Sequence, residues 1–212
     1  MSLRAVVKRA LDVLISAALL ILLSPIMLLV GALVWLDLGW PVLFAQRRPG
    51  LHCRPFTIYK FRTMGEDPVH DEPIPDELRV TRLSGFLRAS SIDEIPELIN
   101  VLRGDMSLVG PRPLLVRYLD RYTPEQRRRH DVRPGITGLA QVRGRNLLSW
   151  EERFQIDVWY VDNWSLWLDG QIIALTILKV VKREGINAAD HLTMYEFGGQ
   201  SGETTGHPKH LQ

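Results

Sequence analysis

Residues 13–36 read VLISAALLILLSPIMLLVGALVWL, an apolar stretch of 24 residues without a charged side chain. At the 1.5 Å rise of an α-helix such a stretch reaches about 36 Å, which is enough to cross the hydrocarbon core of a bilayer. A cleaved signal peptide is disfavoured because the stretch exceeds a normal signal core and no small-x-small cleavage pattern precedes the next charged region. The chain is therefore expected to enter a membrane near its N-terminus.

Ser24 and Pro25 lie in the middle of this stretch. Pro25 lacks a backbone donor and clashes with the preceding turn, so the helix must kink or break, and Ser24 is placed to bond a carbonyl that the proline frees. Basic residues, which favour the cytoplasmic side, flank the stretch at both ends: Arg4, Lys8 and Arg9 before it, and Arg47, Arg48, Arg54, Lys60 and Arg62 after it. We expect a re-entrant helix that leaves on the face it entered, with a kinked single-pass anchor as the alternative.

The whole chain suits one compact domain with appendages, because it has 212 residues, of which 46% are hydrophobic and 24% charged. Its formal net charge of +2 says little about partners. The single cysteine, Cys53, excludes an internal disulfide and a zinc site built from several thiolates. We expect three segments: a re-entrant membrane helix-break-helix (1–40), a cytoplasmic catalytic domain with interfacial amphipathic helices (41–186) and a polar C-terminal tail (187–212).

The expected fold class is α+β, mainly helical with short β-strands. Apolar and β-prone residues predict strand pieces on either side of a turn, and apolar residues at helical spacing predict the helices. The predicted strand pieces are 42–44 and 56–59, around the turn 48–50. Helices are predicted at 78–87, 97–102 and 124–130, and one or two amphipathic helices at 150–183. Loops are predicted at 65–75 and over most of 104–146.

Two adjacent carboxylates, Asp93 and Glu94, precede Pro96. The residue before a proline avoids α geometry, so a helix should begin here and the carboxylates should lie at its N-terminus. Ser91-x-x-Glu94 also fits a capping box, and acids in a first turn stabilise the helix dipole. The local pattern by itself favours a capping role.

Arginines held by prolines and glycines follow these carboxylates. In Gly110-Pro111-Arg112-Pro113 two prolines stiffen the backbone around one guanidinium, which suits a phosphate, although a rigid surface turn is the alternative. Residues 131–146 place further arginines among glycines, which allow close backbone approach, and such a cluster needs an anionic partner or solvent. The run 127–129 of three arginines is expected to be a solvated face, with binding to anionic lipid headgroups as the alternative.

Several motifs in series resemble the bacterial sugar transferase family, the monotopic phosphoglycosyl transferases. The resemblance runs from about residue 7 to residue 185 and is most similar to the small, stand-alone PglC-like type, since the extra N-terminal membrane domain of larger members is lacking. The matching stretches are Lys8-Arg9-x-x-Asp12, Ser24-Pro25, Arg48-Pro49-Gly50, Tyr59 to Met64, Ser91 to Leu98, Asn100 to Ser107, Gly110 to Pro113 and Arg133 to Gly138.

The resemblance implies an enzyme that moves a sugar 1-phosphate from a UDP-sugar to undecaprenyl phosphate and releases UMP, as the first membrane step of glycoconjugate assembly. It implies Asp93 as a covalent nucleophile and Glu94 as its partner, both at a Mg²⁺ ion. Carried over by position, the substrate contacts are Lys60, Arg88, Arg112, Asp169 and, as a donor contact, Arg145. The implied location is the cytoplasmic face of the bacterial inner membrane.

Two other functions stay open at this stage. An Asp-nucleophile phosphohydrolase would share the intermediate, but no Asp-x-Asp pair beside a strand supports it. A non-catalytic membrane scaffold would need none of the carboxylate, magnesium and arginine set. Besides the lipid bilayer, downstream glycosyltransferases are candidate partners, and no nucleic acid is expected. The small type favours diacetylated bacillosamine as the sugar, while N-acetylhexosamines, galactose and glucose stay open.

Overall fold

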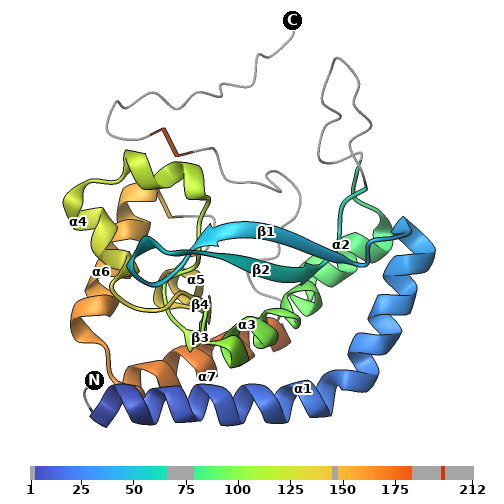
Figure 1. Cartoon of the computed structure of the whole chain (residues 1–212), viewed down its shortest axis with the longest axis horizontal. Coiled ribbons are helices and arrows are strands. Elements are labelled where there is room, and N and C mark those ends of the chain that lie inside the picture. Colours follow the sequence, from blue (N-terminus) through green and yellow to red (C-terminus); the bar gives the residue numbers. More distant parts are fainter. Residues whose placement is uncertain (1–2, 66–78, 145–147, 183–196, 199–212) are drawn as a thin grey trace, which may run out of the picture.

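The computed structural model describes residues 3–65, 79–144, 148–182 and 197–198. Its strands form two small sheets, and helices make up most of the rest (Figure 1). The strands are β1 (Leu43–Pro49), β2 (Pro55–Phe61), β3 (Ser107–Val109) and β4 (Gly135–Thr137). The α-helices are α1 (Leu3–Leu38), α2 (Arg82–Ala89), α3 (Glu97–Arg103), α4 (Pro124–Arg127), α5 (Leu139–Arg143), α6 (Trp150–Asn163) and α7 (Leu166–Lys182). Short 3₁₀ helices are η1 (Leu51–Cys53), η3 (Ile92–Glu94), η4 (Val116–Arg121) and η5 (Arg128–His130).

Helix α1 carries the apolar stretch and bends part-way along its length (Figure 1). Pro25 lies inside the helix, and the Ser24 hydroxyl donates to the Ile21 carbonyl at 2.8 Å. That carbonyl is the one four residues before the proline, which has no N–H to bond it. The structure therefore confirms the predicted kink and the predicted use of Ser24, in a helix that stays continuous rather than breaking.

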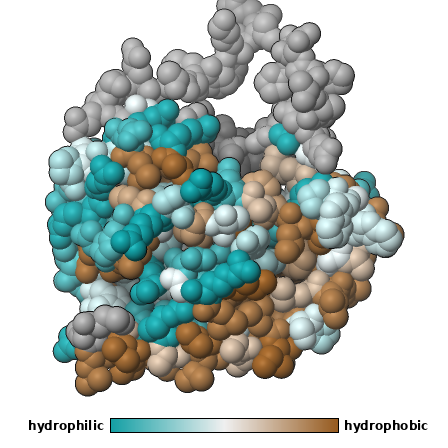
Figure 2. Space-filling model, in the orientation of Figure 1, coloured by the Kyte–Doolittle hydropathy of each residue, from teal (hydrophilic) through white to brown (hydrophobic). Residues whose placement is uncertain are grey.

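The outer surface of α1 is apolar. Leu14, Ile21, Leu22, Leu28 and Leu36 are each more than 60% exposed, and Figure 2 shows the apolar surface gathered over α1. Within the described residues α1 is the one helix long and apolar enough to cross a membrane, and little of its apolar stretch is buried. Since water is a poor solvent for such a surface, α1 is a candidate membrane segment.

The N-terminal turns of α1 are tied to the rest of the chain by polar bonds. Arg9 donates to the Leu102 carbonyl at 3.0 Å, and Asp12, 4% exposed, accepts from the Leu108 amide at 3.1 Å. The membrane candidate is therefore fixed to α3 and β3 rather than tethered loosely.

The hairpin of β1 and β2 packs on α3 through one buried amide. Asn100 donates to the Thr57 carbonyl at 2.7 Å and accepts from the Tyr59 amide at 3.1 Å. Both bonds go to backbone groups of β2, so Asn100 fixes the register of α3 against this strand. Lys60, the next residue of β2, thereby lies over the N-terminal end of α3, where the two carboxylates are.

The second sheet pairs β3 with β4 in parallel and draws two loops together. A Cβ on Gly110 would lie 2.3 Å from the Arg133 carbonyl oxygen, and one on Gly135 would lie 2.1 Å from the Gly110 amide nitrogen. Only glycine allows this approach. The predicted close approach of the glycine-containing segments is confirmed, but the prediction of loops over 104–146 missed β3, β4 and α5.

Two further sequence predictions are corrected by the structure, and others lie outside the described residues. The helix predicted from residue 78 begins at Arg82, because the Thr81 side chain caps it by accepting from the Ser84 amide. Residues 66–78, which hold most of the predicted loop 65–75, lie outside the described residues, as does the tail from residue 187 except for 197–198. Phe197 is 6% exposed and packs with Tyr118, Tyr122 and Phe154, so this part of the tail joins the core.

Candidate active site

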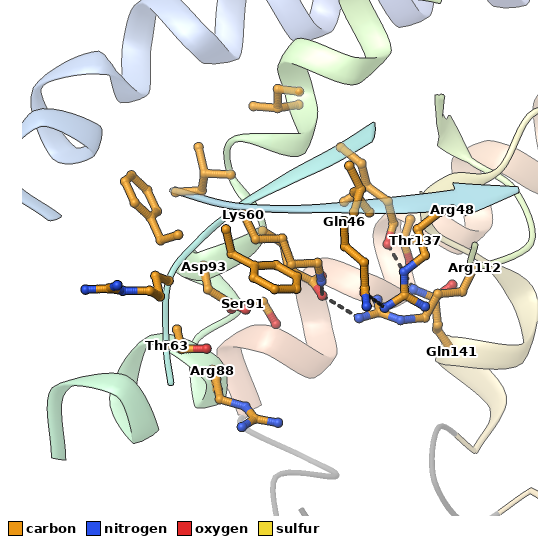
Figure 3. Close-up of a pocket in the computed structure, with 18 of the residues that line it drawn as sticks. Gln46, Arg48, Lys60, Thr63, Arg88, Ser91, Asp93, Arg112, Thr137 and Gln141 are labelled. Atoms are coloured by element: carbon orange, nitrogen blue, oxygen red, sulfur yellow. Dashed lines mark hydrogen bonds and ion pairs between the residues drawn. The ribbon is translucent and has the colours of Figure 1, made fainter. Parts of the chain in front are cut away.

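One face of the β1–β2 hairpin forms a wall of a cavity of about 920 Å³. Side chains of a strand alternate between its faces, and the alternate residues Phe44, Gln46 and Arg48 of β1 all line the cavity. From β2 the alternate residues Ile58 and Lys60 do the same. Asp93, Glu94 and Arg112 line the same cavity, and Figure 3 shows Lys60, Asp93 and Arg112 around it.

Asp93 and Glu94 lie on η3, between α2 and α3. Ser91 precedes them in the left-handed conformation, with φ 57°, and its side chain makes no capping bond. The capping box that the local sequence favoured is therefore wrong. This backbone turn instead presents Asp93 and Glu94 to the cavity.

Glu94 is held by two cations. Its Oε1 accepts from Lys60 Nζ and from Arg112 Nη2, both at 2.6 Å. Burial alone would raise the pKa of Glu94, but the positive charges and hydrogen bonds of Arg112 and Lys60 lower it well below its usual value. Glu94 is therefore a fixed anion at neutral pH, and the same interaction raises the pKa of Arg112.

Asp93 behaves in the opposite way. Burial, followed by the negative charge of Glu94, raises the pKa of Asp93 to about 6. Adjacent carboxylates with pKa values pushed apart are typical of sites that do chemistry. At neutral pH Asp93 is mostly ionised but poorly compensated, which suits a nucleophile better than a structural ion pair would.

A third carboxylate, Glu97, lies beneath the pair and is 1% exposed. Its Oε1 lies 3.0 Å from Lys60 Nζ, without the geometry of a hydrogen bond. Burial and the charge of Glu94 raise the pKa of Glu97 to about 7. Lys60 therefore faces two carboxylates and compensates only one of them fully.

Arg112 is braced from behind by a buried ion pair. Arg129 donates to the Arg112 carbonyl at 2.8 Å and to Asp157 Oδ2 at 2.7 Å and 3.1 Å. Arg129 is 2% exposed, so the prediction that residues 127–129 form a solvated face is wrong for it. The prolines of Gly110-Pro111-Arg112-Pro113 therefore act together with Arg129 to aim the Arg112 guanidinium at Glu94, and the motif is not a plain surface turn.

Most of the predicted site residues come together in the structure. The cavity is lined by Lys60, Arg88, Asp93, Glu94 and Arg112. Arg88 Nη1 is buried without a hydrogen-bond partner in the described part of the chain. A buried cationic donor with no acceptor is costly unless a ligand satisfies it.

Asp169 does not line this cavity. Asp169 is 7% exposed and accepts from Lys8 Nζ at 2.6 Å, from the Tyr160 hydroxyl at 2.6 Å and from Trp164 Nε1 at 3.1 Å. Lys8 and Tyr160 also donate to the Val109 carbonyl, so Asp169 joins α7 and α1 to the loop that carries Arg112. The substrate contact expected of Asp169 stays a prediction that this location does not support, and Arg145 lies outside the described residues.

Sequence reasoning missed several polar residues of the cavity. They come from five elements spread along the chain and include Gln46, Arg48, Thr137, Gln141, Arg153 and Lys179. For Gln46 and Arg48 the alternation along β1 could have signalled a shared face. Nothing in the local sequence of α6 marks the largely buried Arg153, because only the tertiary fold turns it inward.

A bent, outwardly apolar helix and a cavity where carboxylates meet guanidinium groups define a membrane-associated protein with a site suited to a phosphate-bearing ligand. Comparison with known proteins narrows this class. The chain belongs to the bacterial sugar transferase family, whose model matches residues 3–183. The resemblance found from its motifs is thereby confirmed.

Curated relatives agree with this assignment. The chain is 52% identical to an uncharacterized sugar transferase, EpsL, of Bacillus subtilis, over 92% of this chain and 96% of that protein. It is 45% identical to the UDP-glucose:undecaprenyl-phosphate glucose-1-phosphate transferase of Caulobacter vibrioides, over 80% of this chain and 68% of that protein. It is 38% identical to the undecaprenyl-phosphate galactose phosphotransferase of Salmonella typhimurium, over 84% of this chain but 41% of that longer protein.

Proposed function

We propose that this chain transfers a sugar 1-phosphate from a UDP-sugar to undecaprenyl phosphate and releases UMP, with Asp93 as the covalent nucleophile. The observation that carries the proposal is the difference in charge compensation between two adjacent carboxylates. Glu94 is neutralised by Lys60 and Arg112, whereas Asp93 faces the same cavity with its pKa raised to about 6. The names of the relatives supply the donor and acceptor classes.

In the first step a carboxylate oxygen of Asp93 forms a bond to the phosphorus that carries the sugar. The bond from that phosphorus to the UMP oxygen breaks, and UMP leaves with the electron pair. Arg88, whose buried Nη1 has no partner in the described residues, would bind phosphate oxygens as charge builds on them. The result is an acyl phosphate on Asp93 that bears the sugar.

In the second step an oxygen of the polyprenyl phosphate attacks the same phosphorus. The bond to Asp93 breaks, the carboxylate is regenerated, and the product is a polyprenyl diphosphate sugar. Division into two steps means that the two anionic substrates need not meet directly. Lys60 and Arg112 hold Glu94 in place through both steps, and the rigid support of Arg112 by Arg129 limits the reorganisation required.

The residues present fit a magnesium ion. Asp93 and Glu94 supply hard carboxylate oxygens, and both cations bound to Glu94 use Oε1, which leaves Oε2 without a bond among the described residues. The described residues hold no cluster of three or more side chains suited to a metal. A Mg²⁺ ion is usually bound by one or two carboxylates together with substrate phosphates. When bound, the ion would neutralise charge on the phosphate oxygens.

We also infer that the site lies at headgroup depth on the cytoplasmic face of the inner membrane. Helix α1 bends at Pro25, and basic residues flank its apolar stretch at both ends, which favours a re-entrant helix. Such a helix would keep the cavity within reach of the lipid phosphate and of soluble nucleotide. Two of the relatives carry names that specify glucose or galactose as the transferred sugar. The sugar that this chain transfers is determined by the test below.

The test is incubation of the purified chain in lipid with a panel of radiolabelled UDP-sugars, undecaprenyl phosphate and Mg²⁺. Transfer predicts labelled lipid and equimolar UMP from at least one sugar. Asp93→Asn keeps the size of the side chain and should lower turnover by several orders of magnitude. Free sugar phosphate without labelled lipid would indicate a hydrolase, and no turnover of any sugar would indicate a scaffold.

A further inference from the structure

The cavity extends well beyond the reacting carboxylate. Figure 3 shows Asp93, Ser91 and Arg88 toward one end and Arg48, Arg112 and Gln141 toward the other. All of these residues line the same cavity. At the end away from Asp93, Arg112 holds Glu94, whereas the guanidinium group of Arg48 and the neutral polar side chain of Gln141 have no role in the two chemical steps.

Arg48 is directed into this end by the pleat of β1. Gln46 and Arg48, two residues apart, line the cavity, whereas Arg47 between them is exposed and does not. Arg48 Nη2 donates to Gln46 Oε1 at 2.5 Å, which fixes the guanidinium against the wall of the cavity. Two successive arginines of one strand therefore have different environments, and only one faces the site.

The charge at this end is unbalanced. Arg112 is paired with Glu94, but in the described part of the chain no carboxylate forms an ion pair with Arg48, whose partner is the neutral Gln46. Burial and then the positive charge of Arg112 lower the pKa of Arg48 to about 10, which still leaves it a cation at neutral pH. Two nearby cations, one without an anion, create a favourable place for a bound anion.

We propose that Arg48 and Arg112 together bind a second phosphate group, adjacent to the phosphate that Asp93 attacks. A guanidinium fork matches phosphate oxygens in geometry as well as in charge. Gln46 and Gln141, which line the same end, would supply neutral polar contacts around that group. The inference rests on the proposed function, because the proposed reaction supplies two phosphate groups that could occupy this subsite. They are the phosphate of UMP and the phosphate of the polyprenyl acceptor.

The experiment compares Arg48→Gln with the matched control Arg47→Gln in the full chain. Calorimetry measures the affinity for UMP and for uridine, which lacks the phosphate, and initial rates give KM for undecaprenyl phosphate. Loss of a charge-assisted contact should weaken phosphate binding about ten- to a hundredfold. Arg48→Lys keeps the charge without the fork and should fall between the parent and Arg48→Gln. Thermal unfolding of each variant shows whether the fold is retained.

The outcomes separate the sources of the phosphate. Weaker UMP binding by Arg48→Gln, with Arg47→Gln unchanged, assigns the subsite to the nucleotide, and a raised KM for the lipid with unchanged UMP binding assigns it to the acceptor. The inference is overturned if Arg48→Gln changes neither quantity, if Arg47→Gln matches it, or if the parent binds UMP no better than uridine and KM stays constant. UMP binding is measured without turnover. Failure to form the lipid product would therefore refute the proposed function, whereas the phosphate subsite at Arg48 and Arg112 would still be decided by the binding measurements.

Discussion

Replacing Arg112 by Gln removes the guanidinium that donates to Glu94 at 2.6 Å and leaves Lys60 in place. A hydrogen bond between charged groups contributes about 1.5 to 3 kcal/mol. The Arg112 side chain is 36% exposed, so solvent screening favours the lower half of that range. About 1.5 to 2 kcal/mol corresponds to a roughly ten- to thirtyfold loss of kcat/KM if the contact acts in the transition state.

The same change should alter the pH profile. Arg112 lowers the pKa of Glu94 and of Asp93, so its removal lets both rise and the acid limb of kcat/KM should move above about pH 6. UMP release measured from about pH 5 to pH 9 tests this, with exposed Arg82→Gln as the charge-matched control. Arg112→Lys should lose nearly as much as Arg112→Gln if the fork geometry matters. Parent-like kinetics at all pH values for Arg112→Gln would refute the role of this ion pair.

Three further predictions follow from the fold. Asp157→Ala leaves the buried Arg129 without its ion-pair partner and should lower the free energy of unfolding by about 3 to 5 kcal/mol in denaturant melts. Arg128→Ala, whose partners Glu125 and Asp162 are exposed, should leave the denaturant midpoint nearly unchanged. Equal effects of the two variants would contradict the assigned burial. The pKa of Glu97 in the folded state is raised to about 7, so the stabilising contribution of this group is present at low pH and lost as the pH rises through about 7. In metal-free buffer Glu97→Gln should therefore raise Tm at about pH 8 but not at about pH 5. A difference in Tm that does not depend on pH would show that Glu97 does not titrate in this range. Cysteines at positions 3 and 40 in a Cys53→Ser background should both react with a membrane-impermeant maleimide from the cytoplasmic side. Pro25→Ala should move position 3 to the far side of the membrane in a fraction of molecules. Far-side labelling of position 3 with Pro25 intact would show a spanning helix.

The sequence was most informative where a local rule determines the structure. Pro25 predicts a kink because it lacks an amide donor, and Ser24 bonds the carbonyl thus freed. β-prone pieces around Arg48-Pro49-Gly50 predict the hairpin, whose observed strands are longer than the pieces, at Leu43–Pro49 and Pro55–Phe61. Local chemistry of this kind needs no knowledge of the tertiary fold.

The residues that sequence reasoning misjudged depend on contacts distant in the chain. Glu94 fits a capping box locally, but its partners Lys60 and Arg112 are 34 and 18 residues away. Arg129 resembles its solvated neighbours, yet Asp157 on α6 and the Arg112 carbonyl draw it into the core. Ion pairs at such separations outweigh the local preference of a short helix, because the buried partners would otherwise be uncompensated.

The covalent role of Asp93 can be measured directly. The purified chain is mixed with Mg²⁺ and its UDP-sugar in the absence of polyprenyl phosphate, quenched rapidly, and examined by mass spectrometry of the intact protein and of the peptide that contains Asp93. We predict a mass increase equal to one sugar phosphate on that peptide, a burst of about one UMP per chain, and loss of the adduct when the lipid acceptor is added. Asp93→Asn should show neither the adduct nor the burst. Formation of labelled lipid with no adduct on Asp93, or by the Asp93→Asn variant at a rate near that of the parent, would contradict the account.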